Sequence, residues 1–143
     1  MRRKIYLAGS FSDKEKIEKL AKKLENEGFI ITEKWWLSNI KNKKPDDPIE
    51  WLKQKDVEKI FLKNIVGVLR ADILIIVFNK RKYLQGALVE LGVAIPFRSN
   101  KKIFALGKPE NKSVMFYPIE RFFDNTEDLI KEIKGGDKSE YNR

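Results

Sequence analysis

Apolar positions along the chain alternate between short continuous runs and longer segments with helical spacing. The first run covers residues 4–8 and stops at Gly9. Apolar residues then recur at helical spacing, which predicts an amphipathic helix that Gly28 terminates. Ser12 and Glu15 fit a capping box at the start of this helix. The chain therefore begins with a predicted strand and helix.

The same alternation continues through the rest of the sequence. Residues 35–48, with two Trp and two Pro, predict a loop, and the unbroken apolar run at 73–78 is typical of a strand buried on both faces. Residues 135–143 are polar, and we expect them to form a flexible tail. The other predicted strands are at 29–32, 102–106 and near 122–123, and the other predicted helices at 49–70, 86–97 and from Asn125 or Thr126 onward.

This order of elements predicts a single α/β domain over residues 1–134. Strands that alternate with helices form a parallel sheet covered on both faces. We therefore expect a three-layer sandwich around a doubly wound, mostly parallel five-stranded sheet, similar to flavodoxin or Rossmann folds. Ligands bind such sheets beyond the carboxyl ends of the strands, where the strand order reverses. The sequence places this edge around residues 9–12, after Phe78 and after Leu106.

The composition of the chain narrows its chemistry. Among 143 residues there is no cysteine and no histidine. This excludes Ser-His-Asp and Cys-His catalysis and a zinc site of the usual ligand type. Catalytic groups must be carboxylates, tyrosine, lysine or hydroxyls, and we expect no metal and no other cofactor. We find no bilayer-spanning run and no secretory signal, so we expect a cytoplasmic protein without a membrane partner.

The net charge of +9 has two interpretations. The 30 basic residues are spread through nearly every segment and interleaved with glutamate. They describe either a strongly charged, solvated surface or attraction of an anionic ligand or nucleic acid. We favour the first, because diffuse charge does not define a groove. Three lysines near Trp35 and Trp36 would suit a loop that covers a ligand: Lys41, Lys43 and Lys44.

The most informative segment for chemistry is residues 86–94. On a helix, Glu90 shares one face with Ala87, Leu91 and Ala94. An inward carboxylate must be paired, protonated or exposed in a cleft, because burying it unpaired is costly. Its small neighbours leave room for a ligand or another chain segment. The alternative is a glutamate at the edge of the apolar stripe that reaches solvent.

Other positions carry candidate binding groups. Gly9 and Ser10 lie where a strand meets a helix, which suits an anion or a polar sugar group, although an ordinary tight turn explains them too. Asn64 lies on an apolar stripe and binds either a ligand or a backbone group in the core. Trp36 either stacks on a base or closes over the core. Asp72, at the start of its strand, is interpreted as structural.

These motifs together resemble the nucleoside 2-deoxyribosyltransferase-like family, which also contains nucleoside 5′-monophosphate N-glycosidases. The Glu-Leu-Gly segment within residues 86–94 is the most specific piece of the resemblance. The similarity covers nearly the whole domain in the right order. It rests on Lys-Ile-Tyr-Leu-Ala-Gly-Ser at 4–10, Arg-Ala-Asp-Ile-Leu-Ile-Ile-Val at 70–77, the segment at 86–94 and, more weakly, residues 116–130.

The resemblance implies an enzyme that cleaves or transfers the N-glycosidic bond of a (deoxy)nucleoside or nucleoside monophosphate. Glu90 would attack the anomeric carbon and carry the sugar covalently, while Tyr6 would hydrogen-bond that carboxylate and position it. The family also implies a homodimer or higher homo-oligomer, in which residues 116–121 complete a neighbour's pocket. The residues expected to bind the small-molecule substrate are Gly9, Ser10, Phe11, Asn64, Gly86 and Trp36.

Two positions depart from the family's pattern. Asn64 stands where the family usually has an Asp that assists proton transfer at the base, and an amide cannot act as a general acid. Leu84 stands where members that contact the base or phosphate carry Asp or Ser. One alternative function is a catalytically weak or inactive nucleotide-binding or sensing module, which Asn64 favours. A nucleic-acid binder using the basic loop with Trp35 and Trp36 is another, but we do not expect a nucleic-acid partner.

Overall fold

The computed structural model describes residues 2–38, 44–79 and 84–141. Its five strands form one sheet in the order β2-β1-β3-β4-β5, and every neighbouring pair is parallel. This is the flavodoxin-like strand order, which reverses between β1 and β3. The strands are β1 (Lys4–Ala8), β2 (Ile30–Ile31), β3 (Ile73–Val77), β4 (Lys102–Leu106) and β5 (Arg121–Phe123).

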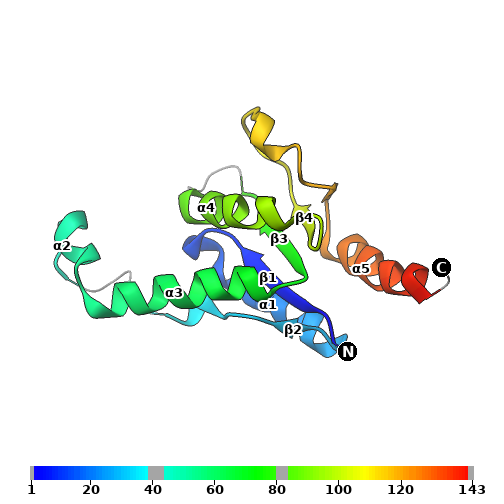
Figure 1. Ribbon diagram of the computed structural model, residues 1–143, viewed down its shortest axis with the longest axis horizontal. Coiled ribbons are helices and arrows are strands. Elements are labelled where there is room, and N and C mark those ends of the chain that lie inside the picture. The colour runs from blue at the N-terminus through cyan, green and yellow to red at the C-terminus, as the bar shows by residue number, and fades with distance from the viewer. Residues whose placement is uncertain (1, 39–43, 80–83, 142–143) are drawn as a thin grey trace.

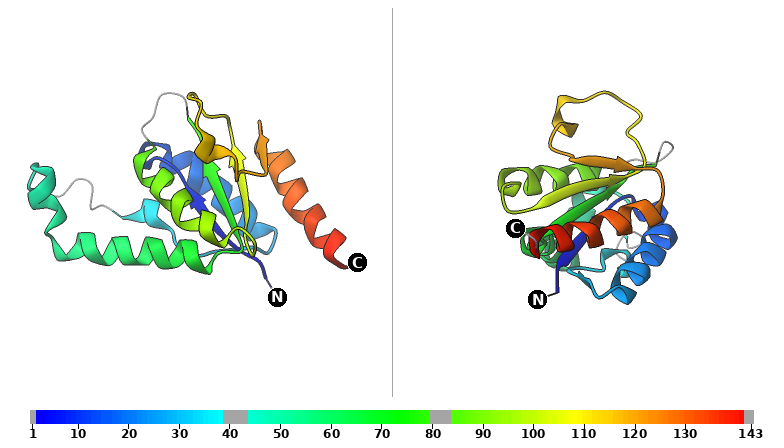
Figure 2. Two further views of the ribbon diagram at one scale, coloured as in Figure 1. Left: turned by 45° about the horizontal axis from the view of Figure 1, so that its top comes forward. Right: turned by 90° about the vertical axis from the view of Figure 1, so that its right-hand side faces the viewer.

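Helices cover both faces of the sheet (Figure 1). α1 (Lys14–Asn26) and α5 (Thr126–Tyr141) pack on one face, and α3 (Lys55–Arg70) and α4 (Gln85–Ala94) pack on the other. α2 (Pro48–Leu52) precedes α3 and projects away from the sheet (Figure 2). The predicted three-layer α/β fold is confirmed. None of the helices in the described ranges has the length and apolar character needed to cross a membrane.

The alternation of side chains along the strands divides the core into two halves. The odd-numbered residues of β3 face α1 and α5, its even-numbered residues face α3 and α4, and all are fully buried. Tyr6 of β1 is paired with Leu74 of β3, so it also lies on the side of α3 and α4. At the other end of the strands, Asp72 accepts a hydrogen bond from the backbone N–H of Lys4 at 2.9 Å, which fits its structural interpretation.

Two helices differ in extent from the sequence pattern. The single helix predicted at 49–70 is broken into α2 and α3, because Lys53 ends the first and Gln54 adopts an extended backbone before the second. No buried side chain lies in this short polar stretch to keep the helix continuous. α5 continues to Tyr141, past the start of the predicted tail. The flexibility of residues 135–143 stays a prediction.

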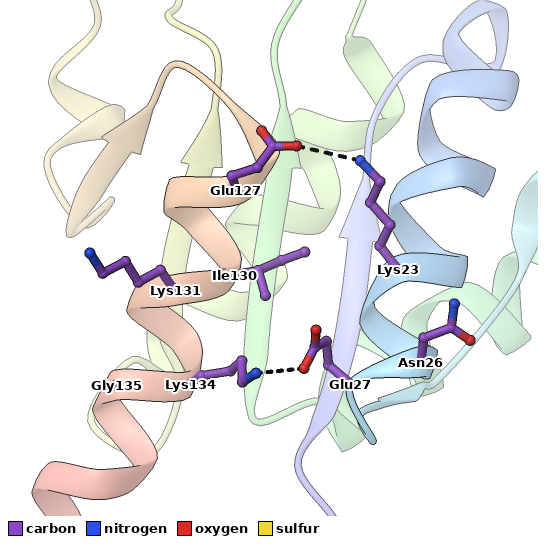
Figure 3. A pocket seen from close by; sticks show the side chains of 8 residues that line it. All are labelled: Lys23, Asn26, Glu27, Glu127, Ile130, Lys131, Lys134 and Gly135. Atoms are coloured by element: carbon purple, nitrogen blue, oxygen red, sulfur yellow. Dashed lines mark hydrogen bonds and ion pairs between the residues drawn. The ribbon is translucent and has the colours of Figure 1, made fainter.

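A surface hollow of about 590 Å³ separates α1 from α5 (Figure 3). Lys23 of α1 pairs with Glu127 of α5 at 3.5 Å, and Lys134 of α5 pairs with Glu27 at 2.6 Å. Ile130 projects between these two pairs. The paired groups are exposed, and exposed ion pairs stabilise a protein by only about 0–1 kcal/mol each. The hollow lies on the face opposite α3 and α4.

Gly107, which follows β4, has a backbone conformation that admits no side chain. Its φ is +87°, and a Cβ there would lie 2.8 Å from the carbonyl oxygen of Phe78. We predict that Gly107→Ala lowers the free energy of unfolding by about 2–4 kcal/mol, from the left-handed backbone plus the clash. Gly28→Ala is the control, because its φ is +94° but its surroundings are open, and we expect a loss of about 1–2 kcal/mol. Chemical denaturation measures both; equal losses would contradict the role of the Phe78 carbonyl.

Candidate active site

A cavity of about 500 Å³ opens at the carboxyl ends of β1 and β3, between α3 and α4. This is the edge at which the strand order reverses, where the sequence predicted a ligand site. Glu90 is the only charged residue among the described residues that line the cavity. Five of the predicted binding residues line it with Glu90: Gly9, Ser10, Phe11, Asn64 and Gly86.

The centre of the site is a hydrogen bond that the Tyr6 hydroxyl donates to Oε2 of Glu90. Tyr6 is fully buried on β1, and Glu90 is half-buried on α4. Burial raises the pKa of Glu90 to about 7, and the hydrogen bond from Tyr6 opposes this by lowering it. Burial, followed by the charges of Glu90 and Glu33, raises the pKa of Tyr6. The tyrosine therefore remains a protonated donor, and the carboxylate is partly ionised at neutral pH.

The position of Glu90 follows from the helical spacing of α4. Ala87, Leu91 and Ala94 are buried against the sheet, and Glu90 lies on the same side. Because Glu90 is in the first two turns of α4, its carboxyl group reaches the cavity mouth at the carboxyl end of β3. The alternative that it reaches bulk solvent from the edge of the stripe does not fit its burial.

Ser10 and Gly9 line the cavity through a turn that differs from the predicted one. The Ser10 hydroxyl caps the 3₁₀ turn η1 (Phe11–Asp13), accepting from the Ser12 N–H at 3.3 Å, and the two serine Oγ atoms lie 2.7 Å apart. The capping box predicted at Ser12 and Glu15 is therefore wrong, because α1 begins only after this turn and has no side-chain cap. A Cβ at Gly9 would lie 2.6 Å from Cδ1 of Ile17. Glycine there also permits close packing of α1.

The prediction for Trp36 needs correction. Trp36 does not line the cavity; it is 4% exposed and packs in the core formed by α1 and the sheet. Trp35 lines the cavity instead, its Nε1 donating to the Leu7 carbonyl at 2.6 Å and its ring centroid 6.4 Å from that of Phe11. The two tryptophan rings meet edge to face in η2 (Trp35–Leu37). Consecutive residues of this turn thus point to different sides.

Asn64 of α3 brings an amide to the same cavity. Its Oδ1 is buried and has no hydrogen-bond partner in the described part of the chain. A buried polar atom left unpaired costs about 1–3 kcal/mol, so a donor that entered this part of the cavity would gain a favourable bond. Leu84, the other departure from the family's pattern, contributes an apolar wall to the cavity.

Several residues at this edge were not identified from the sequence. Trp51 and Phe61 line the cavity, and Phe61 is 56% exposed. Asp13, only 8% exposed, accepts a hydrogen bond from Nδ2 of Asn79 at 2.8 Å and so links the segments that follow β1 and β3. Asp13 and Asn79 each lie shortly after a predicted strand, but no pattern in the sequence pairs two residues that are 66 positions apart.

Among the described residues of the loop predicted at 35–48, those that meet the cavity lie where the loop begins. Trp35 and Ser38 line the cavity. Lys41 and Lys43 lie outside the described residues, and Lys44 is exposed and does not line the cavity. The proposal that this loop covers a ligand stays a prediction.

Comparisons with known proteins identify the family and the fold of the chain. The profile of a family described as nucleoside 2-deoxyribosyltransferase matches residues 5–132. A 2-deoxyribosyltransferase structure from the psychrotolerant bacterium Bacillus psychrosaccharolyticus has a TM-score of 0.63 at 18% identity, over 88% of this chain and 89% of that chain. A CMP N-glycosidase structure from Clostridium botulinum has a TM-score of 0.58 at 15% identity, over 92% and 99%. The comparison with curated proteins gave no match.

At these identities the two structures show a shared fold. The family match goes further, because it spans most of the chain, including the strand that carries Tyr6 and the helix that carries Glu90. The chain belongs to the nucleoside 2-deoxyribosyltransferase family.

Proposed function

We propose that this protein cleaves or transfers the N-glycosidic bond of a (deoxy)nucleoside or nucleoside monophosphate through a covalent intermediate on Glu90. The observation that carries the proposal is the Glu90 carboxyl group in a cavity, hydrogen-bonded by Tyr6. Family membership supports this class of reaction. The two similar structures are a transferase and a glycosidase that acts on CMP, so the acceptor is either a second base or water. A cytoplasmic location is part of the proposal.

The reaction proceeds in two displacements at the anomeric carbon. An oxygen of Glu90 forms a bond to this carbon while the bond to the base nitrogen breaks, and the base leaves with the bonding electron pair. The transition state resembles an oxocarbenium ion, which the carboxylate stabilises. A second base or a water molecule then attacks the same carbon and releases the Glu90 carboxylate. Tyr6 favours the ionised nucleophile because its hydrogen bond lowers the pKa of Glu90.

The base is bound without a general acid from α3. Asn64 can hydrogen-bond the base but cannot protonate it, while Phe11 and Trp35 offer aromatic surfaces for stacking. The same amide supports a second candidate function, a nucleotide-binding or sensing module that has lost turnover.

The first test removes the nucleophile. We predict that Glu90→Gln lowers base release or base exchange by at least about 1,000-fold, because the amide cannot form the glycosyl ester. The assay incubates the protein with deoxynucleosides and a second free base and measures products by chromatography. Mass spectrometry of the wild type detects the glycosylated peptide. Glu127→Gln, an exposed change on α5, is the control and retains activity.

Two outcomes would contradict this proposal. Turnover that survives Glu90→Gln would exclude the covalent route. If the wild type and the variant are equally inert but both bind nucleotides, the protein is a binding module.

The second test uses pH. The nucleophile must be ionised, so kcat/KM is expected to rise with pH through the pKa of Glu90, about 7. Tyr6→Phe removes the hydrogen bond that lowers the pKa of Glu90, so the acid limb of kcat/KM moves to higher pH. The variant therefore loses more activity at pH values below this pKa than at pH values above it. Glu127→Gln, the exposed change on α5, is again the control and leaves the limb in place. A limb that stays in place in Tyr6→Phe would show that the hydrogen bond does not tune the nucleophile.

We also propose a homodimer or higher homo-oligomer that pairs through the α3–α4 face, which consists of Leu62 and Val66 of α3 with Leu88 and Val89 of α4. These apolar side chains are between 41% and 60% exposed. A helix that is apolar on nearly all sides, as α4 is, is typical of burial on both sides. α3 and α4 are in contact with each other, and a two-fold axis would pair the same face on two copies.

The cavity is part of this proposal. Val89 lies both on the α3–α4 face and on the cavity wall, so a second copy would cover the mouth of the site. The segment around η5 (Val114–Phe116) exposes Val114 and Tyr117, which suits a contact with another subunit. That residues 116–121 complete a neighbour's pocket stays a prediction.

The oligomer is tested by one charge on α3. We predict that Val66→Glu lowers the mass found by size-exclusion chromatography with light scattering to that of the 16.8 kDa monomer, because a carboxylate buried in an apolar interface is costly. Lys131→Glu, on the opposite face of the sheet and exposed, leaves the mass of the wild type unchanged. A monomeric wild type, or an assembly unaffected by Val66→Glu, would disprove the assignment.

A further inference from the structure

Gly67 is buried near the C-terminal end of α3, at the point where the ring of Tyr6 meets the helix backbone. Glycine inside a helix costs about 1 kcal/mol relative to alanine, so a buried helical glycine calls for a packing reason. A Cβ at Gly67 would lie 3.1 Å from Cδ2 and Cε2 of Tyr6 and 2.9 Å from Cβ of Glu33. An alanine therefore does not fit at residue 67 unless the ring of Tyr6 or the side chain of Glu33 moves.

A second contact fixes the helix at the same residue. The hydroxyl of Thr32 donates to the carbonyl oxygen of Gly67 at 2.8 Å, and the Thr32 N–H donates to the Ile5 carbonyl at 3.0 Å. Thr32 thus ties α3 to the residue of β1 that precedes Tyr6. The two hydrogen bonds of Thr32 hold α3 at a fixed distance from β1, and the ring of Tyr6 fills the space between α3 and β1.

We propose that Gly67 is a positioning residue for the Tyr6–Glu90 pair. Its missing side chain lets the tyrosine ring lie against the backbone of α3, which places the hydroxyl at the Glu90 carboxylate. Gly67 does not line the cavity, so it acts through Tyr6, which packs against it. The inference rests on the proposed role of Glu90 as the nucleophile, but the geometry of the pair is measurable without a substrate.

A methyl group at residue 67 has a defined electrostatic consequence. Displacement of the tyrosine ring weakens the hydrogen bond that lowers the pKa of Glu90, so this pKa rises. Glu90 is the only charged residue among the described cavity residues, so no second lining charge masks the change. Glu33 is another carboxylate near Tyr6 and Glu90, and its charge raises the pKa of Tyr6. The methyl group of an alanine at residue 67 would displace Glu33 as well as Tyr6.

The experiment titrates Glu90 directly. Carboxyl ¹³C shifts of glutamate-labelled protein are followed with pH, and the Glu90 signal is identified by its loss in Glu90→Gln. We expect Gly67→Ala to raise the midpoint of Glu90 by about half a pH unit or more. Gly135→Ala, in α5 where an added Cβ meets nothing within 4 Å, leaves the midpoint unchanged. A midpoint equal to that of the wild type in Gly67→Ala would overturn the proposal.

A double variant separates positioning from general damage. In a Tyr6→Phe background the hydroxyl is absent, so Gly67→Ala should cause no further rise of the Glu90 midpoint. An equal rise in that background would also overturn the proposal. If Gly67→Ala does not fold, Thr32→Val removes the hydrogen bond to the Gly67 carbonyl without added bulk, and it should raise the midpoint in the same direction; no rise there would overturn the proposal.

Activity distinguishes this inference from the proposed function. In an active enzyme, Gly67→Ala moves the acid limb of kcat/KM to higher pH, while KM above that limb is unchanged because residue 67 touches no substrate. If the wild type shows no turnover but the titration responds as expected, the proposed function fails and the positioning role stands.

Discussion

The hydrogen bond from Tyr6 to Glu90 joins a strand and a helix whose residues lie 84 positions apart. A carboxyl group buried in an apolar cavity is protonated at neutral pH unless a donor or a positive charge compensates. No positive charge lines the described cavity, so Tyr6 supplies this compensation. The fold delivers both groups: the alternation of β1 turns Tyr6 toward α3 and α4, and the helical spacing of α4 turns Glu90 toward the sheet.

The sequence was sufficient to predict those parts of the fold that repeat a pattern. The apolar run at 73–78 predicted a strand buried on both faces, and its position in a strand-helix order located the carboxyl edge of the sheet. The spacing of Glu90 placed it on one face with two alanines and a leucine, but did not separate an inward carboxylate from one that reaches solvent at the edge of the stripe. Trp36 was not predictable in this way, since its direction depends on a single 3₁₀ turn without periodicity. The pair of Asp13 and Asn79 exists only in three dimensions.

Helix α3 shows a further limit of periodicity. Its apolar residues occupy more of the circumference than one buried stripe needs, and Phe61, Leu62 and Val66 are about half exposed. Spacing alone does not separate a face that packs on the sheet from a face that lines a cavity or meets another subunit. Gly67 carried a usable signal, because a glycine inside a helical pattern indicates close approach of another group. Only the structure identifies that group as Tyr6.

The distribution of charge connects the departure at Asn64 with the nucleophile. Glu90 is the only charged residue among the described residues that line the cavity. A second carboxylate in the same cavity would raise the pKa of Glu90 further, since two like charges oppose each other's ionisation. We infer that an amide at residue 64 gives up proton donation to the leaving base but keeps Glu90 ionisable near pH 7. In the proposed reaction, departure of the base then depends on hydrogen bonds to the base and on the Glu90 carboxylate, which would stabilise the cationic transition state.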